Sequence, residues 1–518
     1  MRFFRLVFGV VLGVSLVVTQ TGSAFADEAQ LLDLVKGLQK QIEAQSQRIQ
    51  QLESQGAGGG SISNVPLSQL EKDVALLKRQ QEVNQEVQIK NDKDFNKKVG
   101  ESLGGADKWL KDLSFYGDLR LRYEAIKFTS GARGADTNGN DPDRNRFRFR
   151  VRYGFEKKFS PEWKAGFGLA VSDSTTSSNG LQADPTSANT TFTNNFDYKN
   201  IWVDKAYAAY SPDWAKIGPI SNFSITGGKT DNPFERGSKQ LIWKMGNVRP
   251  EGLAETADFN LYEGDNVNLK AYGLLGQYVL QEKGAYPTFT GSSPTGSQRD
   301  AELFAYQVGI NPSFSTGLSA EPIEELSTLT LYSYPGYAGN SNWKINGITG
   351  TSLAKGNPVS SDATGLDASH FNVLNTYHEF TVKAFGTPVT PFFEYAKNLS
   401  DKSTTFGIQD ASNAWALGIN LGKVQKKGSW EANYAYKNIG ANSIVGAFAD
   451  SDFGDGRGAP GNKGSVIGLG YGLTDFLKLN FAGYLTKPLD PGFKNGVSGS
   501  EIADKRVARF QTDLTWKF

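Results

Sequence analysis

Arginine residues recur at every second position in two short stretches of the sequence. They are Arg120 and Arg122 in the first stretch, and Arg146, Arg148, Arg150 and Arg152 in the second. Alternate side chains of a β-strand point to the same face, so each stretch would present its guanidinium groups in a row. Such rows can attract anions, or they can form ion pairs with acidic residues such as Asp118 and Glu124 on the same face. The near equality of 55 Lys and Arg with 54 Asp and Glu favours pairing, and the two roles are compatible.

The sequence offers little for other kinds of chemistry. It contains no cysteine, which excludes disulfides, thiolate metal ligands and a thiol nucleophile. Its two histidines, His370 and His378, lie near no G-x-S-x-G motif, so we predict no enzyme activity. The segment 450–456 begins like a calcium-binding loop but has no Glu at its twelfth position, so we expect neither a metal ion nor a cofactor. The balanced charge also predicts no nucleic-acid partner.

The arginines lie in segments with the two-residue period of β-strands. Between the arginines of the second stretch stand the apolar residues Phe147, Phe149, Val151, Tyr153 and Phe155. A strand with one apolar and one charged face fits a soluble sandwich as well as a membrane barrel. In a barrel, an arginine on the lipid face near the midplane would cost about 2–4 kcal/mol, so the arginines would have to face the lumen.

The same period continues to the C-terminus in about 16 candidate strands, with long and short connections that alternate as in outer-membrane barrels. The strands begin near residues 113, 144, 163, 198, 220, 250, 265, 300, 325, 370, 387, 412, 428, 463, 476 and 504. The mean hydropathy of −0.42 argues against a helical membrane protein, but barrel strands show only half of their side chains to lipid. We therefore predict an all-β transmembrane barrel of about 16 antiparallel strands in residues 101–518.

The first 26 residues have the three parts of an export signal. Arg2 and Arg5 form a basic start, residues 6–18 are apolar, and Ala24-Phe25-Ala26 matches a cleavage site. The apolar run is shorter than the about 20 residues that span a bilayer, so we predict a signal peptide in residues 1–26. A retained membrane anchor is the alternative.

Residues 27–100 carry a heptad pattern in place of the strand pattern. Its apolar seam, with one polar layer, consists of Leu31, Val35, Leu38, Ile42, Gln45, Ile49 and Leu52. A Gly/Ser break at 56–61 precedes a second helical stretch. The seam predicts an α-helical coiled coil through which copies of the chain associate, although a helix packed on its own barrel stays open. An even number of strands puts both barrel ends on the periplasmic side, so the coiled coil would lie in the periplasm.

The last strand ends in alternating apolar residues. They include Phe510, Leu514, Trp516 and the terminal Phe518. Such an ending resembles the assembly signal of bacterial outer-membrane proteins. We therefore expect the barrel assembly machinery and outer-membrane lipid among the partners of this chain.

Several stretches, taken together, resemble bacterial putative porins that carry an N-terminal coiled coil. They are residues 116–124, 228–234, 250–254, 388–395, 428–437 and 450–454, which spread over nearly the whole predicted barrel. The resemblance implies a bacterial outer-membrane β-barrel that lets small hydrophilic solutes or ions diffuse passively. It implies no particular solute. We further expect a homotrimer.

In porins of this size the third long loop folds into the lumen. Here that loop covers residues 232–249, and its charged residues are Glu235, Arg236, Lys239, Lys244 and Arg249. We predict a constriction loop with a basic bias, in a pore lined by the six arginines and biased towards anions. A surface loop is the alternative.

Two other functions stay open at this level. The barrel could be a structural tether that contacts the periplasm or the cell wall through the coiled coil. It could also be the scaffold of an electron-transfer conduit, with the haem carried by another chain.

Overall fold

The computed structural model describes most of the C-terminal part of the chain. The described residues are 110, 112–128, 143–177, 180–183, 187–193, 195–242, 248–281, 300–315, 321–337, 357–358, 370–400, 411–454, 458–489 and 506–518. They belong to the second of two compact units, Gly105–Phe518. The expected signal peptide (1–26) and coiled coil (27–100) lie outside the described residues and stay predictions.

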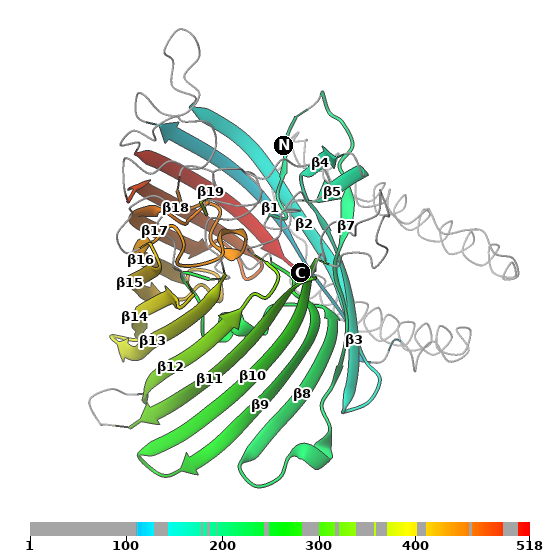
Figure 1. Ribbon diagram of the computed structural model, residues 1–518, viewed down its shortest axis with the longest axis vertical. Coiled ribbons are helices and arrows are strands. Elements are labelled where there is room, and N and C mark those ends of the chain that lie inside the picture. Colours follow the sequence, from blue (N-terminus) through cyan, green and yellow to red (C-terminus); the bar gives the residue numbers. More distant parts are fainter. Residues whose placement is uncertain are drawn as a thin grey trace, which may run out of the picture. The chain divides into compact units, whose positions relative to one another are not determined.

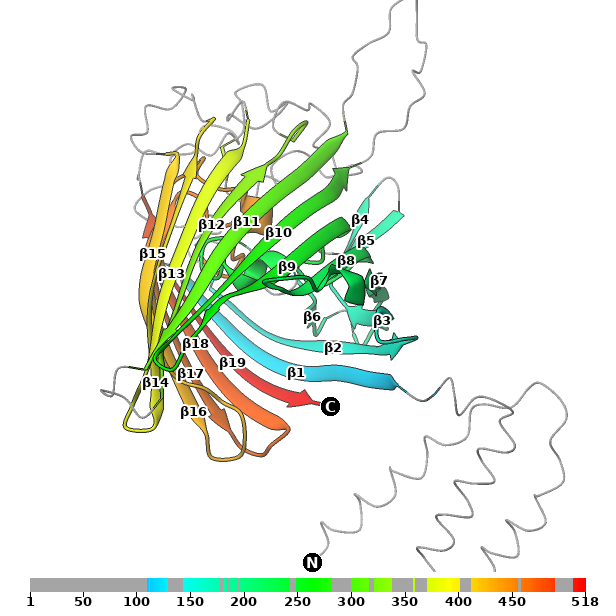
Figure 2. The ribbon, with the colours of Figure 1, turned by 90° about the horizontal axis from the view of Figure 1, so that it is seen from below.

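The second unit is a closed antiparallel β-barrel (Figure 1, Figure 2). Its sixteen main strands are β1 (Leu113–Phe128), β2 (Arg144–Lys158), β3 (Trp163–Val171), β7 (Ile201–Tyr210), β8 (Ile220–Lys229), β9 (Glu251–Glu263), β10 (Val267–Gln281), β11 (Ala301–Phe314), β12 (Ile323–Ser333), β13 (Asn372–Ala384), β14 (Thr387–Asn398), β15 (Asn413–Gly422), β16 (Trp430–Ile439), β17 (Asn462–Gly472), β18 (Leu477–Pro488) and β19 (Val507–Lys517). Each main strand pairs with the next one along the chain, and β19 pairs with β1. The predicted barrel and strand number are confirmed, and every predicted start lies within three residues of the observed one.

The two faces of the strands differ as the alternating pattern requires. The outward face exposes large apolar side chains, among them Leu121, Phe147, Val203, Leu275, Val308, Leu329, Leu417, Leu469, Phe481 and Phe510. The residues between them point inward, are mostly more buried, and include charged side chains such as Arg122 and Glu394. No helix within the described ranges is long and apolar enough to cross a membrane.

The connection between β3 and β7 contains structure that the sequence reasoning missed. Strands β4 (Ser174–Ser177) and β5 (Gly180–Ala183) form a separate two-stranded ribbon, and β6 (Thr190–Thr191) pairs with β2 at Arg148 and Phe149. The reason lies in strand length. β3 pairs with β2 only from Arg152 to Lys158, so the remaining backbone groups of β2 need another partner, which β6 supplies in part.

The barrel closes through its C-terminal residue. The N–H of Gly117 donates to the carbonyl of Phe518 over 2.8 Å, and the N–H of Phe518 donates back to the carbonyl of Gly117 over 3.2 Å. The ring of Phe518 lies directly over Gly117, where a Cβ would come within 2.4 Å of its Cε2. Glycine at this position therefore lets the last aromatic ring seat on β1.

We expect Gly117→Ala to weaken this closure. The added methyl group would overlap the Phe518 ring and the Arg152 carbonyl, which should lower the free energy of unfolding by about 1–3 kcal/mol. The fractions of folded and unfolded protein, read from gel bands over a series of denaturant concentrations, give the free energy of unfolding of each variant. Gly273→Ala on β10 is the matched control, because a Cβ there meets nothing within 4 Å. Equal stability of both variants would contradict the expectation.

Candidate functional site

The predicted arginines gather on one inner wall of the barrel. The β1–β2 register places Arg122 beside Arg148 and Arg120 beside Arg150. Like charges directly opposite each other destabilise a sheet unless counter-charges separate them. The separating carboxylates form the ion pairs Arg146–Glu124 (2.6 Å), Arg150–Asp118 (2.7 Å), Arg122–Asp513 (2.7 Å) and Arg148–Asp173 (3.2 Å). Pairing is thus the main state of these arginines.

Some positive character remains on this wall. Arg120 lies 3.6 Å from Asp513, which already binds Arg122 through two hydrogen bonds, and it also donates to the Asn189 side chain. The Nε atoms of Arg120 and Arg148 are buried and have no acceptor among the described residues. The wall therefore carries more guanidinium donors than its carboxylates use. Arg152, the last of the six, stands opposite Asp118 in the register.

The connection between β8 and β9 begins with a tightly anchored turn. Asn232 caps the short helix η2 (Pro233–Arg236) by accepting a hydrogen bond from the Phe234 N–H over 3.1 Å. The Phe234 side chain is fully buried and packs edge-on against Tyr332 and Tyr278, both of which point into the barrel. The first residues of the connection therefore turn inward and not towards the surface.

The next residues of this connection follow the inner wall across several strands. Thr328 on β12 donates to the Gly237 carbonyl (2.8 Å), and Ser238 donates to Asn375 on β13 (2.6 Å). The N–H of Gln240 then donates to Glu394 on β14 (2.6 Å). We call residues 232–242 the first inward loop. Its backbone also accepts hydrogen bonds from Gln307 of β11 and Lys437 of β16, so the loop is held against the wall between these strands.

The charged side chains of this connection have carboxylate partners. Arg236 pairs with Asp258 on β9 and stacks on the ring of Tyr272 at 3.8 Å, and Lys239 pairs with Glu379 on β13. Arg249 pairs with Asp231 (2.9 Å) and Asp204 (3.3 Å). Glu235 is half-buried on η2, and Lys244 lies outside the described residues. The Arg236 and Lys239 side chains stay 45% and 33% exposed, so their charge remains accessible to solvent.

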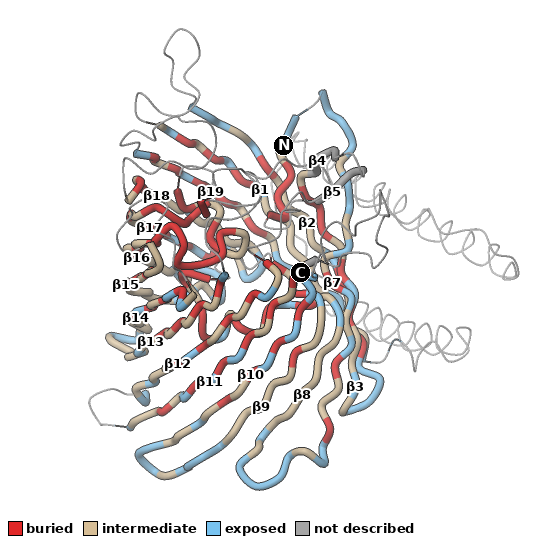
Figure 3. The backbone as a smooth tube through the Cα atoms, viewed as in Figure 1, coloured by how far each residue is buried: buried red, intermediate tan, exposed pale blue. Residues whose placement is uncertain are grey.

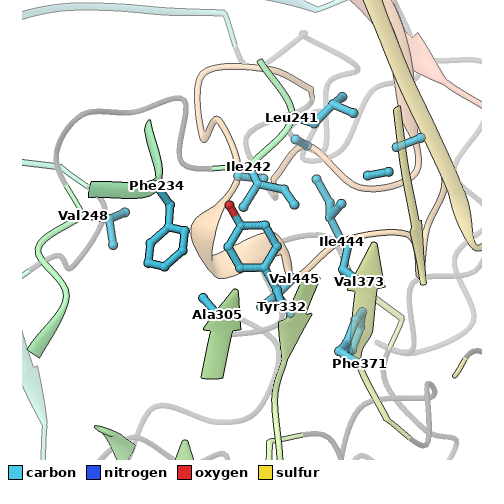
Figure 4. Close-up of a cluster of buried hydrophobic side chains, with 14 of the residues drawn as sticks. Phe234, Leu241, Ile242, Val248, Ala305, Tyr332, Phe371, Val373, Ile444 and Val445 are labelled. Carbon is cyan, nitrogen blue, oxygen red and sulfur yellow. The ribbon is translucent and has the colours of Figure 1, made fainter. Parts of the chain in front are cut away.

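A second inward loop, residues 440–454 between β16 and β17, was missed by the sequence reasoning. Most of it is buried (red in Figure 3) and the rest is half-buried, and it contains the short helix η3 (Gly446–Phe448). Figure 4 shows its residues Ile444 and Val445 in one apolar cluster with Leu241 and Ile242, the last two residues of the first inward loop. The signal available in the sequence was the run of apolar residues from 444 to 449, which is unusual for a surface loop.

The acidic residues of the second inward loop face cations. Asp450 lies 3.6 Å from Lys437 on β16, and Asp452 lies 2.8 Å from Arg509 and 3.4 Å from Arg122. These carboxylates, which begin the calcium-like pattern, are thus used in ion pairs. The part of the chain that the structure describes contains no group of three or more side chains suited to hold a metal ion.

A protein-family model described as "Putative porin" matches residues 133–321 and 323–489 of this chain. The chain belongs to this family. This porin is therefore an outer-membrane β-barrel of a channel-forming family, as the resemblance in its sequence implied.

Several solved structures show a distant likeness to this porin. OprB of Pseudomonas putida, in a high-pH structure, is 10% identical over 81% of this chain and 97% of its own, with a TM-score of 0.44. OmpT of Vibrio cholerae is 10% identical over 78% and 97%, with a TM-score of 0.37. A triple mutant of Rhodopseudomonas blastica porin is 11% identical over 78% and 100%, with a TM-score of 0.33. A search of the curated proteins found no match.

The predicted apolar residues near the C-terminus of this porin lie on the outward face of β19. Phe510 and Phe518 are exposed, and Leu514 and Trp516 are partly exposed, on the outward face of β19. Their neighbours Arg509, Gln511 and Asp513 are buried on the inward face. The last strand thus has an apolar outward face and a polar, charged inward face.

We expect Glu394→Gln to release the first inward loop of this porin. The Glu394 carboxylate is fully buried and accepts the N–H groups of Lys239 and Gln240 on one oxygen and the Asn375 amide on the other. A glutamine has one acceptor oxygen, so buried donors would lose their partner at a cost of about 1–3 kcal/mol. Single-channel recording should then show larger and noisier current steps.

Glu263→Gln, at an exposed position near the end of β9, is the control for this variant. It removes the same charge without touching either loop. Identical step size and noise in the Glu394 variant and the control would show that Glu394 does not hold the loop.

Proposed function

We propose that this protein is a general porin through which small hydrophilic solutes and ions diffuse passively across the outer membrane. One observation carries the proposal. The backbone of the first inward loop is bound to the inner wall, while the charged ends of Arg236 and Lys239 remain exposed to solvent inside the barrel. A wall-bound loop whose paired but solvent-exposed charged ends face the lumen narrows and polarises a water-filled passage without closing it.

The charge arrangement supports a modest anion bias. The basic side chains of the inner wall and of the first inward loop are largely paired with carboxylates, so most of the field that six arginines would create is cancelled. Arg120 shares the single charge of Asp513 with Arg122, so the β1–β2 wall keeps a positive charge. Anions would therefore be favoured over cations, but both would pass.

The homotrimer expected from the sequence belongs to the same proposal. It is supported by the heptad seam in residues 27–100, which would bring copies of the chain together. In the same way, we propose that the outward apolar residues of β19, which end at Phe518, are the part that the barrel assembly machinery binds.

Conductance after charge reversal in the first inward loop tests the porin function. The wild-type protein, reconstituted in planar bilayers, should give discrete steps with a preference for anions. Arg236→Glu combined with Lys239→Glu should reverse the preference, because both side chains are accessible to solvent. The reversal potential in a salt gradient measures this. A folded wild-type protein without conductance would overturn the proposed function. Unchanged selectivity in the double variant would show that the first inward loop does not set the ion preference.

Crosslinking tests the homotrimer. Treatment of the full chain in outer membranes with a short crosslinker should give a product of three chains, and conductance steps should appear in threes. A variant that lacks residues 27–100 should give less of this product if the heptad seam drives association. A product no larger than the single chain would contradict the trimer.

A further inference from the structure

We propose that the second inward loop contributes to ion selectivity together with the first, with Asp452 as the residue that masks the charge of Arg122 and Arg509. The inference rests on the proposed porin function. Part of the selectivity is thus assigned to a loop other than the one from which a constriction was predicted. Asp452 would act on permeating ions by cancelling the field of two arginines on the inner wall.

The second inward loop is held in place by apolar packing and by hydrogen bonds to other connections. Phe448 stacks on Tyr334 with ring centroids 6.0 Å apart and planes 15° apart. The Asn357 side chain donates to the carbonyls of Ala441 (2.9 Å) and Ile444 (2.8 Å) and accepts from the Gly446 N–H (2.7 Å). These contacts fix the loop before any charge is considered, so the position of Asp452 follows from packing.

Two carboxylates of the loop then point to different walls. The Asp450 side chain accepts the Asp452 N–H over 3.1 Å, which closes a tight turn. Asp450 lies beside Lys437 of β16, whereas Asp452 reaches Arg509 of β19 and Arg122 of β1. The turn therefore delivers one negative charge to the arginine wall from a segment that is not part of it.

Asp452 is the main counter-charge of Arg509. Among the described residues, no other carboxylate lies within ion-pair distance of Arg509, whose guanidinium also donates to the Ser451 carbonyl over 3.2 Å. Arg122 has a second partner in Asp513 and would keep it. Removal of the Asp452 charge would leave Arg509 without a counter-charge and Arg122 with one fewer.

The charge on Asp452 persists at neutral pH. Burial alone would raise the pKa of Asp452, but the guanidinium groups of Arg509 and Arg122 outweigh this effect and hold the pKa well below its usual range. The masking of these arginines is therefore constant under the conditions in which an outer-membrane channel works.

The first test is the variant Asp452→Asn in planar bilayers. Asparagine has nearly the same shape, so the loop should stay in place while one negative charge is lost. One unit charge that acts on an ion at about 7 Å through water changes its occupancy about threefold. Loss of this charge raises the occupancy by anions and lowers the occupancy by cations by that factor. We therefore expect the anion-to-cation permeability ratio, measured from reversal potentials in a salt gradient, to rise by about seven- to ninefold.

Asp213→Asn is the matched control. Asp213 is an exposed residue of η1 (Asp213–Ala215), between β7 and β8, and pairs with Lys216 away from both inward loops. This variant changes the net charge of the chain by the same amount and should leave the permeability ratio unchanged. An equal shift in both variants would mean that net charge, and not the masking by Asp452, determines selectivity.

A second variant, Arg509→Gln, keeps the inference falsifiable if Asp452→Asn does not reach the membrane. It removes the cation that Asp452 masks, leaves Asp452 with one cationic partner fewer, and should shift the ratio towards cations by a similar factor. The double variant should return to the wild-type ratio. Reversal potentials that stay unchanged in conducting Asp452→Asn and Arg509→Gln channels would overturn the inference while leaving the porin function intact. Larger steps without a change of selectivity would do the same, because Asp452 would then only hold the loop.

Discussion

The interior of this barrel is organised by the need to neutralise guanidinium groups that strand parity forces inward. On β1, β2 and β19 the apolar residues occupy the outward positions, so the arginines between them have no other side to face. Their own strands supply too few carboxylates, namely Asp118, Glu124 and Asp513. The remaining counter-charges come from connections, with Asp173 after β3 and Asp452 after β16. Charge balance therefore requires parts of these connections to lie inside the barrel.

The first inward loop also depends on buried polar groups of β14 and β16. Glu394 and Lys437 are both fully buried, and each contacts the backbone of Gln240, one as acceptor and the other as donor. A buried charge without partners is energetically costly. Without the first inward loop, Glu394 and Lys437 would each lose a hydrogen-bond partner, so the folded barrel is more stable with the loop in place. The first inward loop is thus held by specific hydrogen bonds and not only by apolar contact.

The local residue pattern was enough to predict the barrel, but it could not predict which distant residues form ion pairs. The strand starts, the inward arginines and the alternating last strand follow from a two-residue period that any single strand reveals, as the segment from Arg144 to Phe155 shows. The partners Asp173 and Asp452 could not be predicted, because each lies on a connection whose path depends on other strands. The small strand β6 could not be predicted for the same reason, because it pairs with the part of β2 that the shorter strand β3 does not reach. The second inward loop did leave a sequence signal in its apolar run, but the acidic pair beside it was compared only with a calcium-binding loop, and no inward path was predicted.

The spacing of Asp450 and Asp452 has a physical explanation in this structure. Two carboxylates in a tight turn would repel each other if both pointed the same way, and the hydrogen bond from the Asp452 N–H to Asp450 turns them apart. One then meets Lys437, which also holds Gln240 of the first inward loop, and the other meets Arg509 and Arg122. The same turn therefore joins the first inward loop to the arginine wall. The width of the passage and its preference for ions, as we propose them, are then not independent properties, because one short acidic turn is bonded to both elements.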